Sequence, residues 1–381
     1  MKLLVVSHAC VTPANQAFFA EVKNVTGWDV SLLLPRQWAT AYGKVESVER
    51  LHGFAGDLHT IPVWMCGNIP LHFYKSPLLG LLRTIQPDAI YVHHEPYGLA
   101  TFQVFAANHL TVQCPIGFYA AQNILKNYPA PFRWFEKAVL AQARFAFPVS
   151  QGALDVLRTK GYQAQAEILP LSVDLELYRP RPGWAKNKRG ELGIRPEEFL
   201  VGYVGRLAEE KGLGTLLQAL ARMPQQGWRC LLVGSGPFEM ILRARALELG
   251  IADRVIFAGY VEHLEAANWY SCLDLLVLPS ESRSHWREQF GRVLAEANAC
   301  EVPVVGTDSG EIGNILRGLG GGLVVPESNP VELANAILAM MEKPERRKEF
   351  AMSGAQAVRA RFDQNVVAKQ FAASIQQVLW V

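Results

Sequence analysis

Two cations in the second half of this 381-residue chain have the types and spacing needed to bind a diphosphate. Arg206 and Lys211 lie on a glycine-rich loop that follows the apolar run 200–204. A guanidinium binds two phosphate oxygens through its planar fork, and an ammonium adds a compact point charge. A helix expected to begin near Thr215 would add backbone N–H donors. Together these groups would stabilise charge on a departing diphosphate, although in isolation a solvated charged loop explains the residues equally well.

Two carboxylates further along the chain form a second candidate group. Glu288 and Glu296 flank Gly291, which lets the backbone approach a ligand before a helix containing Glu296 begins. A carboxylate accepts several hydrogen bonds, and this suits the hydroxyls of a sugar or a ribose. Two glutamates at this spacing are usually surface residues, so the pair gains weight only beside other motifs.

The elements that must position these residues are short runs rich in Val, Ile and Leu, separated by stretches of helical periodicity. Such runs are typical of parallel strands buried on both faces. They cover 3–7, 30–34, 89–92, 116–120, 146–149 and 168–171, and then 200–204, 230–233, 255–258, 275–278, 302–306 and 323–325. Helices are expected over 215–223 and 331–341, among others. The pattern predicts an α/β protein with two doubly wound units.

A polar and basic segment broken by Pro and Gly, from about residue 178 to residue 198, separates the two sets of strands. Such a composition is typical of an exposed connection between domains. We therefore predict a first domain over 1–178, a second over 179–365, and a C-terminal helix over 366–381 that packs back on the first domain.

The overall composition excludes several classes of protein. Lys plus Arg exceeds Asp plus Glu by only 37 − 35 = 2, which does not indicate a nucleic-acid partner. The six cysteines lack zinc-site spacing and are expected to be reduced. The apolar run 3–6 is too short for a signal peptide, and no segment reaches the roughly 20 apolar residues that span a bilayer. We expect a cytoplasmic protein and leave peripheral attachment to the inner face of the membrane open.

Several motifs of the second half follow one another in a characteristic order and spacing. They are Gly205-Arg206 with Glu210-Lys211-Gly212, then 232–237, Leu278-Pro279-Ser280, the pair Glu288 and Glu296, and 306–312. In this order the chain resembles the retaining glycosyltransferases of family 4, or glycosyl transferases group 1. The resemblance covers nearly the whole second domain. It implies the GT-B architecture, in which two Rossmann-like domains with parallel sheets face an interdomain cleft.

The resemblance also implies roles for individual residues. Arg206 and Lys211 would bind the donor diphosphate, Glu288 the donor sugar and Glu296 the ribose. The other expected donor contacts are Gly205, Gly234, Gly236, Val261, Phe290 and Gly291. The expected catalytic residues are His94, Arg206, Lys211 and Glu288.

In the first half, His94-Glu95-Pro96 resembles a His-Glu-Pro motif of some members of this family. A histidine there would contact the transferred sugar or orient the acceptor, whereas without the resemblance a structural role is more frequent. His93 is expected to point to the opposite side of the strand. The expected acceptor-side residues are His8, Asn15, His94, Gln122 and Asn123.

Two segments depart from the pattern of the family. The loop 7–16 lacks the Gly-Gly pair that many relatives carry after the first strand, so its backbone approaches a ligand less freely. The segment 169–174 reads Leu-Pro-Leu-Ser-Val-Asp, where relatives commonly have Pro-Asn-Gly-Val-Asp.

The resemblance implies transfer of a hexose from a UDP- or GDP-linked sugar to a glycan or lipid-linked acceptor, with retention of configuration, as in the synthesis of cell-envelope polysaccharides. The chain has no Asp-x-Asp metal motif at a strand end, and Arg206 and Lys211 supply positive charge, so we expect metal-independent transfer without a cofactor. A nucleotide-sugar epimerase, a sugar phosphorylase of the same fold and a non-catalytic nucleotide-sugar-binding protein remain open alternatives.

The aromatic and basic stretches 73–79 and 131–137 suggest contact with anionic lipid, although packing on the protein's own core is the more frequent explanation.

Overall fold

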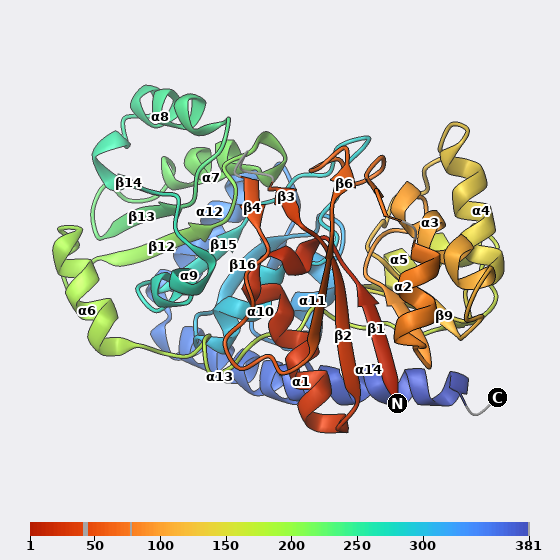
Figure 1. The fold of residues 1–381 in the computed structure, drawn as a ribbon. Coiled ribbons are helices and arrows are strands. Elements are labelled where there is room, and N and C mark those ends of the chain that lie inside the picture. The colour runs from red at the N-terminus through yellow and green to blue at the C-terminus, as the bar shows by residue number, and fades with distance from the viewer. Residues whose placement is uncertain (41–44, 77, 380–381) are drawn as a thin grey trace. The chain divides into compact units, whose positions relative to one another are not determined.

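The computed structural model describes residues 1–40, 45–76 and 78–379, and the chain forms two compact units. Unit 1 comprises Met1–Pro170 and Gln364–Val381, and unit 2 comprises Leu171–Asp363. Each unit is built on a parallel sheet with helices packed against it (Figure 1). Pro77 in the stretch 73–79, and the last two residues of the expected C-terminal helix, lie outside the described residues.

The sheet of unit 1 has seven parallel strands in the order β11-β10-β9-β8-β1-β2-β5. The strands are β1 (Lys2–Val6), β2 (Asp29–Pro35), β5 (Asp57–Ile61), β8 (Ala89–Val92), β9 (Ile116–Ala120), β10 (Phe145–Pro148) and β11 (Gln165–Ala166). Two short antiparallel pairs join β3 (Gln37–Ala39) to β4 (Val45–Ser47) and β6 (Val63–Trp64) to β7 (Phe73–Tyr74). The helices are η1 (Ala9–Val11), η2 (Pro13–Gln16), α1 (Ala17–Thr26), α2 (Leu78–Ile85), α3 (Leu99–His109), α4 (Phe132–Gln142), α5 (Gln151–Thr159) and α14 (Gln364–Leu379).

Alternation along β1 shows how this sheet is covered on both faces. Leu3 and Val5 belong to a core that includes Phe371 of α14, whereas Leu4 and Val6 belong to the core on the other face. All four side chains are fully buried, as the central strand of a doubly covered sheet requires. Because α14 packs against α1 and buries Phe371, the end of the chain is part of unit 1 (Figure 1).

The sheet of unit 2 has six parallel strands in the order β14-β13-β12-β15-β16-β17. They are β12 (Phe199–Val204), β13 (Trp228–Val233), β14 (Val255–Gly259), β15 (Leu275–Leu278), β16 (Val304–Thr307) and β17 (Gly322–Val325). The helices are α6 (Pro182–Glu191), η3 (Glu209–Lys211), α7 (Leu213–Leu220), α8 (Glu239–Glu248), η4 (Ala252–Arg254), α9 (His263–Tyr270), α10 (Arg292–Ala299), α11 (Ile312–Leu319), α12 (Pro330–Glu342) and α13 (Pro344–Arg361).

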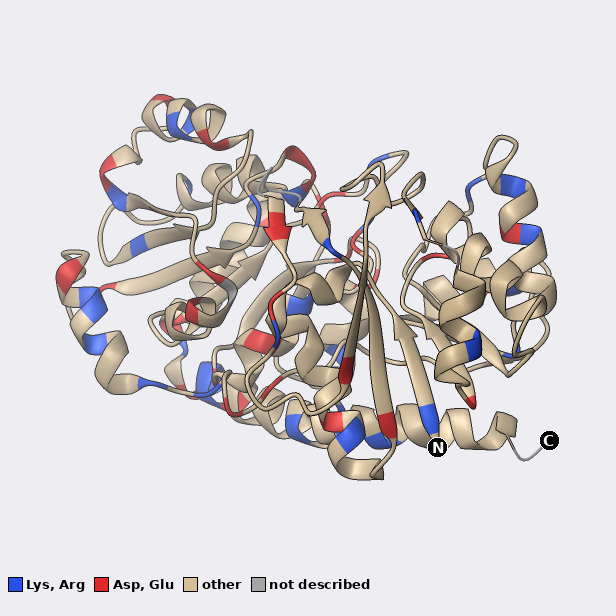
Figure 2. Ribbon diagram, in the orientation of Figure 1, with Lys and Arg blue, Asp and Glu red and all other residues tan. Residues whose placement is uncertain are grey.

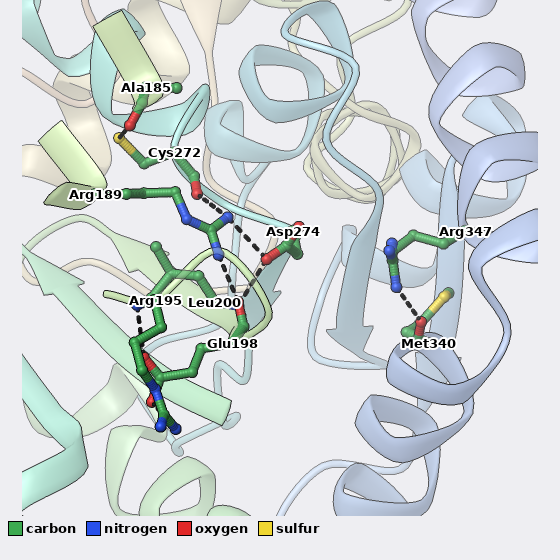
Figure 3. Close-up of polar contacts among 9 residues, drawn as sticks. All are labelled: Ala185, Arg189, Arg195, Glu198, Leu200, Cys272, Asp274, Met340 and Arg347. Atoms are coloured by element: carbon green, nitrogen blue, oxygen red, sulfur yellow. Dashed lines mark hydrogen bonds and ion pairs between the residues drawn. The ribbon is translucent and has the colours of Figure 1, made fainter. Parts of the chain in front are cut away.

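The basic segment expected to be an exposed connection instead contains helix α6. Pro182 stands in its first turn, where a missing N–H costs no helical hydrogen bond. Arg189 donates to the carbonyl of Cys272 at 3.3 Å and pairs with Asp274 Oδ2 at 3.0 Å (Figure 3). The same carboxylate oxygen accepts the N–H of Leu200 at 2.8 Å. The ion pair therefore fastens the helix to the residue before β15, and the same carboxylate links it to the start of β12, a contact that composition alone does not indicate.

One predicted strand is wrong. The run 168–171 is not a strand, and the edge strand of the sheet is β11, a few residues earlier. Leu169 N still donates to Pro148 O at 2.9 Å, but Pro170 has no N–H and ends the ladder there.

Charges of both signs are interspersed along both units (Figure 2). Within the described part of the chain, no helix has the length and apolar content needed to cross a membrane.

Candidate functional site

In unit 2, the loops that follow the neighbouring strands β12 and β15 are fastened together. Gly212 precedes α7 with φ +64°, and a Cβ atom at this position would lie 1.8 Å from Pro279 O. Only glycine combines this backbone conformation with so close an approach. Glu281 N also donates to Glu210 O at 2.9 Å. The two loops therefore form one junction at the carboxyl edge of the sheet, where ligands bind in open α/β sheets.

Lys211 and Glu288, 77 residues apart in sequence, form an ion pair at this junction. Lys211 Nζ lies 2.7 Å from Glu288 Oε2, and the side chains are 20% and 11% exposed. Ser280 Oγ donates to the same carboxylate oxygen at 3.0 Å, and the Lys211 ammonium lies 4.7 Å from the ring centre of Trp286. The structure thus brings together two of the four predicted charged residues and adds two partners to which the sequence analysis gave no role.

The backbone of Glu288 is also fixed, from the side of β16. Its carbonyl oxygen accepts the N–H of Glu311 at 3.1 Å. Gly310 has φ +54°, and a Cβ atom there would lie 2.1 Å from Glu288 O. Glycine at position 310 is therefore what allows this segment to hold Glu288 in place.

Arg206 lies on the same loop as Lys211 but is more exposed. Its guanidinium pairs with Glu210 Oε1 at 2.9 Å, and its side chain is 42% exposed. Tyr203 OH donates to the Arg206 carbonyl at 2.8 Å and so fixes the loop next to Gly205. One loop therefore presents an exposed guanidinium and a half-buried ammonium, the pair expected to bind a diphosphate.

The glycines after β13 serve close backbone packing. A Cβ atom on Gly234 would lie 2.0 Å from Gly205 O, and one on Gly236 would lie 2.2 Å from Leu207 O. Gly234 N donates to Gly259 O at 2.8 Å. Side chains at these positions would push apart the loops that follow β12 and β13. These contacts explain why glycine stands at both predicted donor positions, whatever the ligand.

Glu296 has a different partner from Glu288. Gly291 caps α10 with φ +72°, and Phe290 is buried against Phe362. Glu296 is also buried, and it accepts a hydrogen bond from Tyr270 OH at 2.7 Å. No sequence motif pointed to Tyr270, because it comes from α9. The remaining predicted donor residue, Val261, follows β14 and is partly buried.

In unit 1, two predicted histidines meet a third that the sequence analysis missed. His8 N donates to His94 Nε2 at 2.9 Å, and the two ring centres are 4.7 Å apart. His72 packs edge-on to His94 at 5.1 Å between ring centres, and Trp38 lies within 4.8 Å of both His8 and His72. Burial lowers the pKa of His94 well below 6.5 and lowers that of His8 to about 3. These rings are therefore neutral at pH 7.

This histidine cluster has the composition of a metal site but not the available lone pairs. His8, His72 and His94 each offer one ring nitrogen, and the three nitrogens lie within 4.8 Å of one another. His94 Nε2 accepts the His8 N–H, so its neutral ring carries the proton on Nδ1. His72 Nδ1 donates to Ile69 O at 2.9 Å, which leaves the lone pair of that ring on Nε2. A metal ion would bind all three rings only if His94 gave up its hydrogen bond to the loop that follows β1.

His93 and the other acceptor-side residues predicted in unit 1 have partners outside this cluster. His93 Nδ1 lies 3.2 Å from Ser7 Oγ, so His93 and His94 contact different groups. Asn15 Nδ2 donates to Ala9 O at 2.8 Å within the loop after β1. Gln122 Oε1 accepts the N–H of Ile124 at 3.1 Å in the segment after β9, which also contains Asn123.

Comparison with known proteins identifies the second unit. Residues 185–357 match the family model of glycosyl transferases group 1. These residues form a glycosyl transferases group 1 domain. The domain contains the whole junction of Lys211 and Glu288, together with Arg206 and Glu296.

Two curated relatives are glycosyltransferases by name. The chain is 25% identical over 324 residues to alpha-D-kanosaminyltransferase of Streptomyces kanamyceticus, covering 80% of this chain and 82% of that protein. It is 30% identical over 235 residues to D-inositol 3-phosphate glycosyltransferase of Xylanimonas cellulosilytica, covering 60% of this chain. That alignment spans 55% of the relative's length, so the chain matches about half of it.

Solved structures show the same fold along the chain. HepE of Anabaena, in complex with UDP, superposes with a TM-score of 0.77 at 20% identity, covering 99% of this chain and 100% of that one. WaaG, described as a glycosyltransferase of lipopolysaccharide biosynthesis, gives a TM-score of 0.67 at 16% identity, covering 98% of each chain. The two Rossmann-like units, one of them the glycosyl transferases group 1 domain, therefore have the GT-B fold predicted from the sequence.

Proposed function

We propose that this chain is a retaining glycosyltransferase that moves a hexose from a nucleotide-diphosphate sugar to a glycan or lipid-linked acceptor. The observation that carries the proposal is the ion pair of Lys211 and Glu288 at the junction of two strand-end loops, inside a glycosyl transferases group 1 domain. The names of the curated relatives agree with a transfer reaction. HepE has been solved with UDP-glucose, which makes UDP-glucose the first donor to test here.

In the proposed reaction the acceptor hydroxyl oxygen forms a bond to the anomeric carbon while the bond from that carbon to the β-phosphate oxygen breaks. The bonding electrons leave with the diphosphate, and the acceptor proton passes to a phosphate oxygen on the same face of the sugar. Arg206 and Lys211 stabilise the charge that grows on the leaving group, so we propose transfer without a metal ion or a cofactor. Glu288, oriented by Ser280 and Lys211, accepts hydrogen bonds from the donor sugar, and Glu296 accepts them from the ribose.

We assign the acceptor side to unit 1. The proposed acceptor residues are His8, Asn15, His94, Gln122 and Asn123, and His94 contacts the transferred sugar or the acceptor hydroxyl. The neutral state of the buried His94 ring supports this role, because its Nε2 accepts the His8 N–H and its Nδ1–H is left to donate to a hydroxyl oxygen.

A panel of UDP-, GDP- and ADP-sugars tests the activity. Thermal shift identifies the donor that binds, and release of the nucleoside diphosphate is then measured with and without candidate glycan acceptors. An epimerase would convert the donor sugar without any acceptor, and a phosphorylase would require orthophosphate. Acceptor-dependent release supports transfer, whereas either of the other patterns contradicts it. Anomeric analysis of the product by NMR tests retention.

We further propose that the protein is cytoplasmic and touches the inner face of the membrane. Trp134 of α4 is 62% exposed and stands between exposed Arg133 and Lys137 on the same helix. Trp64 is 55% exposed, with the Lys75 ammonium 4.0 Å from its ring centre. Exposed aromatic rings beside cations suit an anionic lipid surface.

Co-sedimentation with phosphatidylglycerol vesicles, but not with phosphatidylcholine vesicles, is expected at low salt. Equal sedimentation with both, or with neither, contradicts the proposal.

A further inference from the structure

Glu95 is a charged residue of the His-Glu-Pro motif to which the proposed reaction gives no role. It follows β8 and comes directly after His94. Glu95 Oε1 accepts the backbone N–H of Ala121 at 2.8 Å and that of Gln122 at 3.1 Å. These two N–H groups begin the segment after β9, the strand that pairs with β8. One carboxylate oxygen therefore continues the contact between neighbouring strands beyond the ends of both.

The backbone of Glu95 is itself held in place. Its carbonyl oxygen accepts hydrogen bonds from Thr101 Oγ1 at 2.7 Å and from Gly98 N at 3.2 Å. Thr101 lies in the first turn of α3. The two hydrogen bonds therefore close the turn that contains Pro96 and joins β8 to α3. The side chain is thus presented from a rigid base, as a residue that positions another segment requires.

The segment after β9 is fixed at its far end by separate contacts. The rings of Tyr97 and Tyr128 lie 4.3 Å apart, and the Lys160 ammonium lies 4.5 Å from the ring centre of Tyr128. Lys160 also pairs with Glu136 of α4 at 2.6 Å. Tyr128 also hydrogen-bonds the side chain of Gln122. The Glu95 carboxylate, in contrast, binds the backbone N–H groups of Ala121 and Gln122 at the start of the segment.

We propose that Glu95 is a positioning residue that holds Gln122 and Asn123 in a fixed relation to His94. These three residues belong to the acceptor side of the proposed transferase, so the functional part of this inference rests on that proposed function. The link is short, because His94 is the neighbour of Glu95 in the chain and Gln122 N is bound by its carboxylate. Loss of the carboxylate would release the backbone at Ala121 and Gln122 without removing any side chain expected to touch the substrate.

The ionisation of this carboxyl group provides a specific readout. The residue keeps some contact with solvent, but its carboxyl group is closely surrounded by protein, and this burial raises its pKa to about 7. The Ala121 and Gln122 N–H groups and Lys160 oppose the shift, and Glu136 adds to it. Tyr97 and Tyr128 also face the group. An ionised carboxylate accepts stronger hydrogen bonds than a protonated one. The two hydrogen bonds of Glu95 to the Ala121 and Gln122 amides, called the clamp below, are therefore strongest above pH 7 and weaken as the pH falls through this value.

Amide hydrogen exchange of the full chain tests the clamp without any substrate. In Glu95→Ala we expect the Ala121 and Gln122 amides to exchange about tenfold faster or more at pH 8, as loss of a charge-assisted hydrogen bond implies. Glu95→Gln keeps a carbonyl oxygen at the same place and should fall between Glu95→Ala and the wild type. Its exchange, corrected for the intrinsic rate, should not depend on pH between 6 and 8, while that of the wild type should. Glu136→Gln is the matched control at pH 8, because it removes a nearby carboxylate that does not bind these amides. Since Glu136 raises the pKa of Glu95, the pH step of this variant should move to lower pH.

The outcomes separate the clamp from the proposed activity. Equal exchange at Ala121 and Gln122 in the wild type and Glu95→Gln at every pH would overturn the inference, as would a pH step that persists in Glu95→Gln. If Glu95→Ala does not fold, the comparison of Glu95→Gln with the wild type decides the question alone. Once an acceptor is found, Glu95→Gln should raise the acceptor KM at pH 8 several-fold more than it changes kcat. Absence of any transferase activity would end the functional assignment and leave the exchange result standing.

Discussion

Lys211 Nζ lies 2.7 Å from Glu288 Oε2, at the junction where Gly212 lies against Pro279 O. The pair is largely buried, and Glu288 also accepts a hydrogen bond from Ser280 Oγ. Each member belongs to a loop at the carboxyl edge of the parallel sheet, where substrates of α/β enzymes bind. This position is what one expects of a binding site and not of a purely structural salt bridge.

Removal of the carboxylate is expected to stop the reaction while the protein stays folded. Glu288→Ala should lower kcat by at least about 100-fold, as loss of a preorganised electrostatic contact does. The free energy of unfolding should fall by about 3 kcal/mol, because the largely buried Lys211 ammonium loses its partner. Steady-state kinetics and urea unfolding measure the two effects. Glu191→Ala breaks the ion pair of Lys188 on α6 and should leave kcat unchanged. Equal kinetic losses in both variants would contradict the assignment.

The hydroxyl of Tyr270 is expected to serve donor binding through Glu296. Tyr270→Phe removes the hydrogen bond to Glu296 Oε2 and should raise the donor KM by about tenfold, with a smaller effect on kcat. Tyr162→Phe is the matched control, because Tyr162 is also buried and its hydroxyl donates to Gln165 O at 3.0 Å in unit 1. Both variants should lose about 1 kcal/mol of stability. A donor KM that rises equally in both variants would place Tyr270 among purely structural residues.

Two glycines two residues apart should respond oppositely to alanine. Gly212→Ala puts a Cβ atom 1.8 Å from Pro279 O at a φ of +64° and should cost at least about 2 kcal/mol of unfolding free energy. Gly214→Ala meets no atom within 4 Å inside α7 and should gain up to about 1 kcal/mol. Chemical denaturation of both variants measures the difference. Similar effects of the same sign would show that the junction is not close-packed in solution.

The neutral histidines of unit 1 should make the fold sensitive to acid. Burial lowers the folded-state pKa of His72 below the usual 6.5, so its contribution to stability is full above pH 6.5 and is lost as the pH falls. The wild type should therefore lose stability more steeply than His72→Gln between pH 6.5 and pH 5, by about 1 kcal/mol per pH unit. Glu95, with its raised pKa, acts in the opposite sense in both proteins and cancels in the difference. Parallel profiles from denaturant titrations at each pH would contradict this prediction.

Much of the fold could be predicted because buried parallel strands are continuous apolar runs. The runs 89–92, 116–120 and 275–278 coincide with β8, β9 and β15. Strand β5 at the sheet edge could not be predicted, because Asp57 and His59 interrupt the apolar pattern. The contacts of α6 in the basic segment could not be predicted either, because the ion pair of Arg189 and Asp274 joins residues far apart in sequence.

The candidate site shows the same limit. Arg206, Lys211, Glu288 and Glu296 could be named because they belong to motifs of recognisable spacing. Tyr270, His72 and Trp38 could not, since each comes from a different element and meets its partner only after folding. Such partners carry no local pattern. The contacts of Glu95 with Ala121 and Gln122 likewise depend on the pairing of β8 with β9.

We propose above all that the junction of Lys211 and Glu288 binds a nucleoside diphosphate without a metal ion. Calorimetric titration of UDP, GDP and ADP into the full-length protein, with EDTA present, tests it most directly. We expect one nucleotide to bind with a 1:1 stoichiometry to the wild type and at least about tenfold more weakly to Lys211→Ala, while Lys188→Ala binds as the wild type does. Failure of all three nucleotides to bind, or equal affinity in the wild type and Lys211→Ala, would contradict the account.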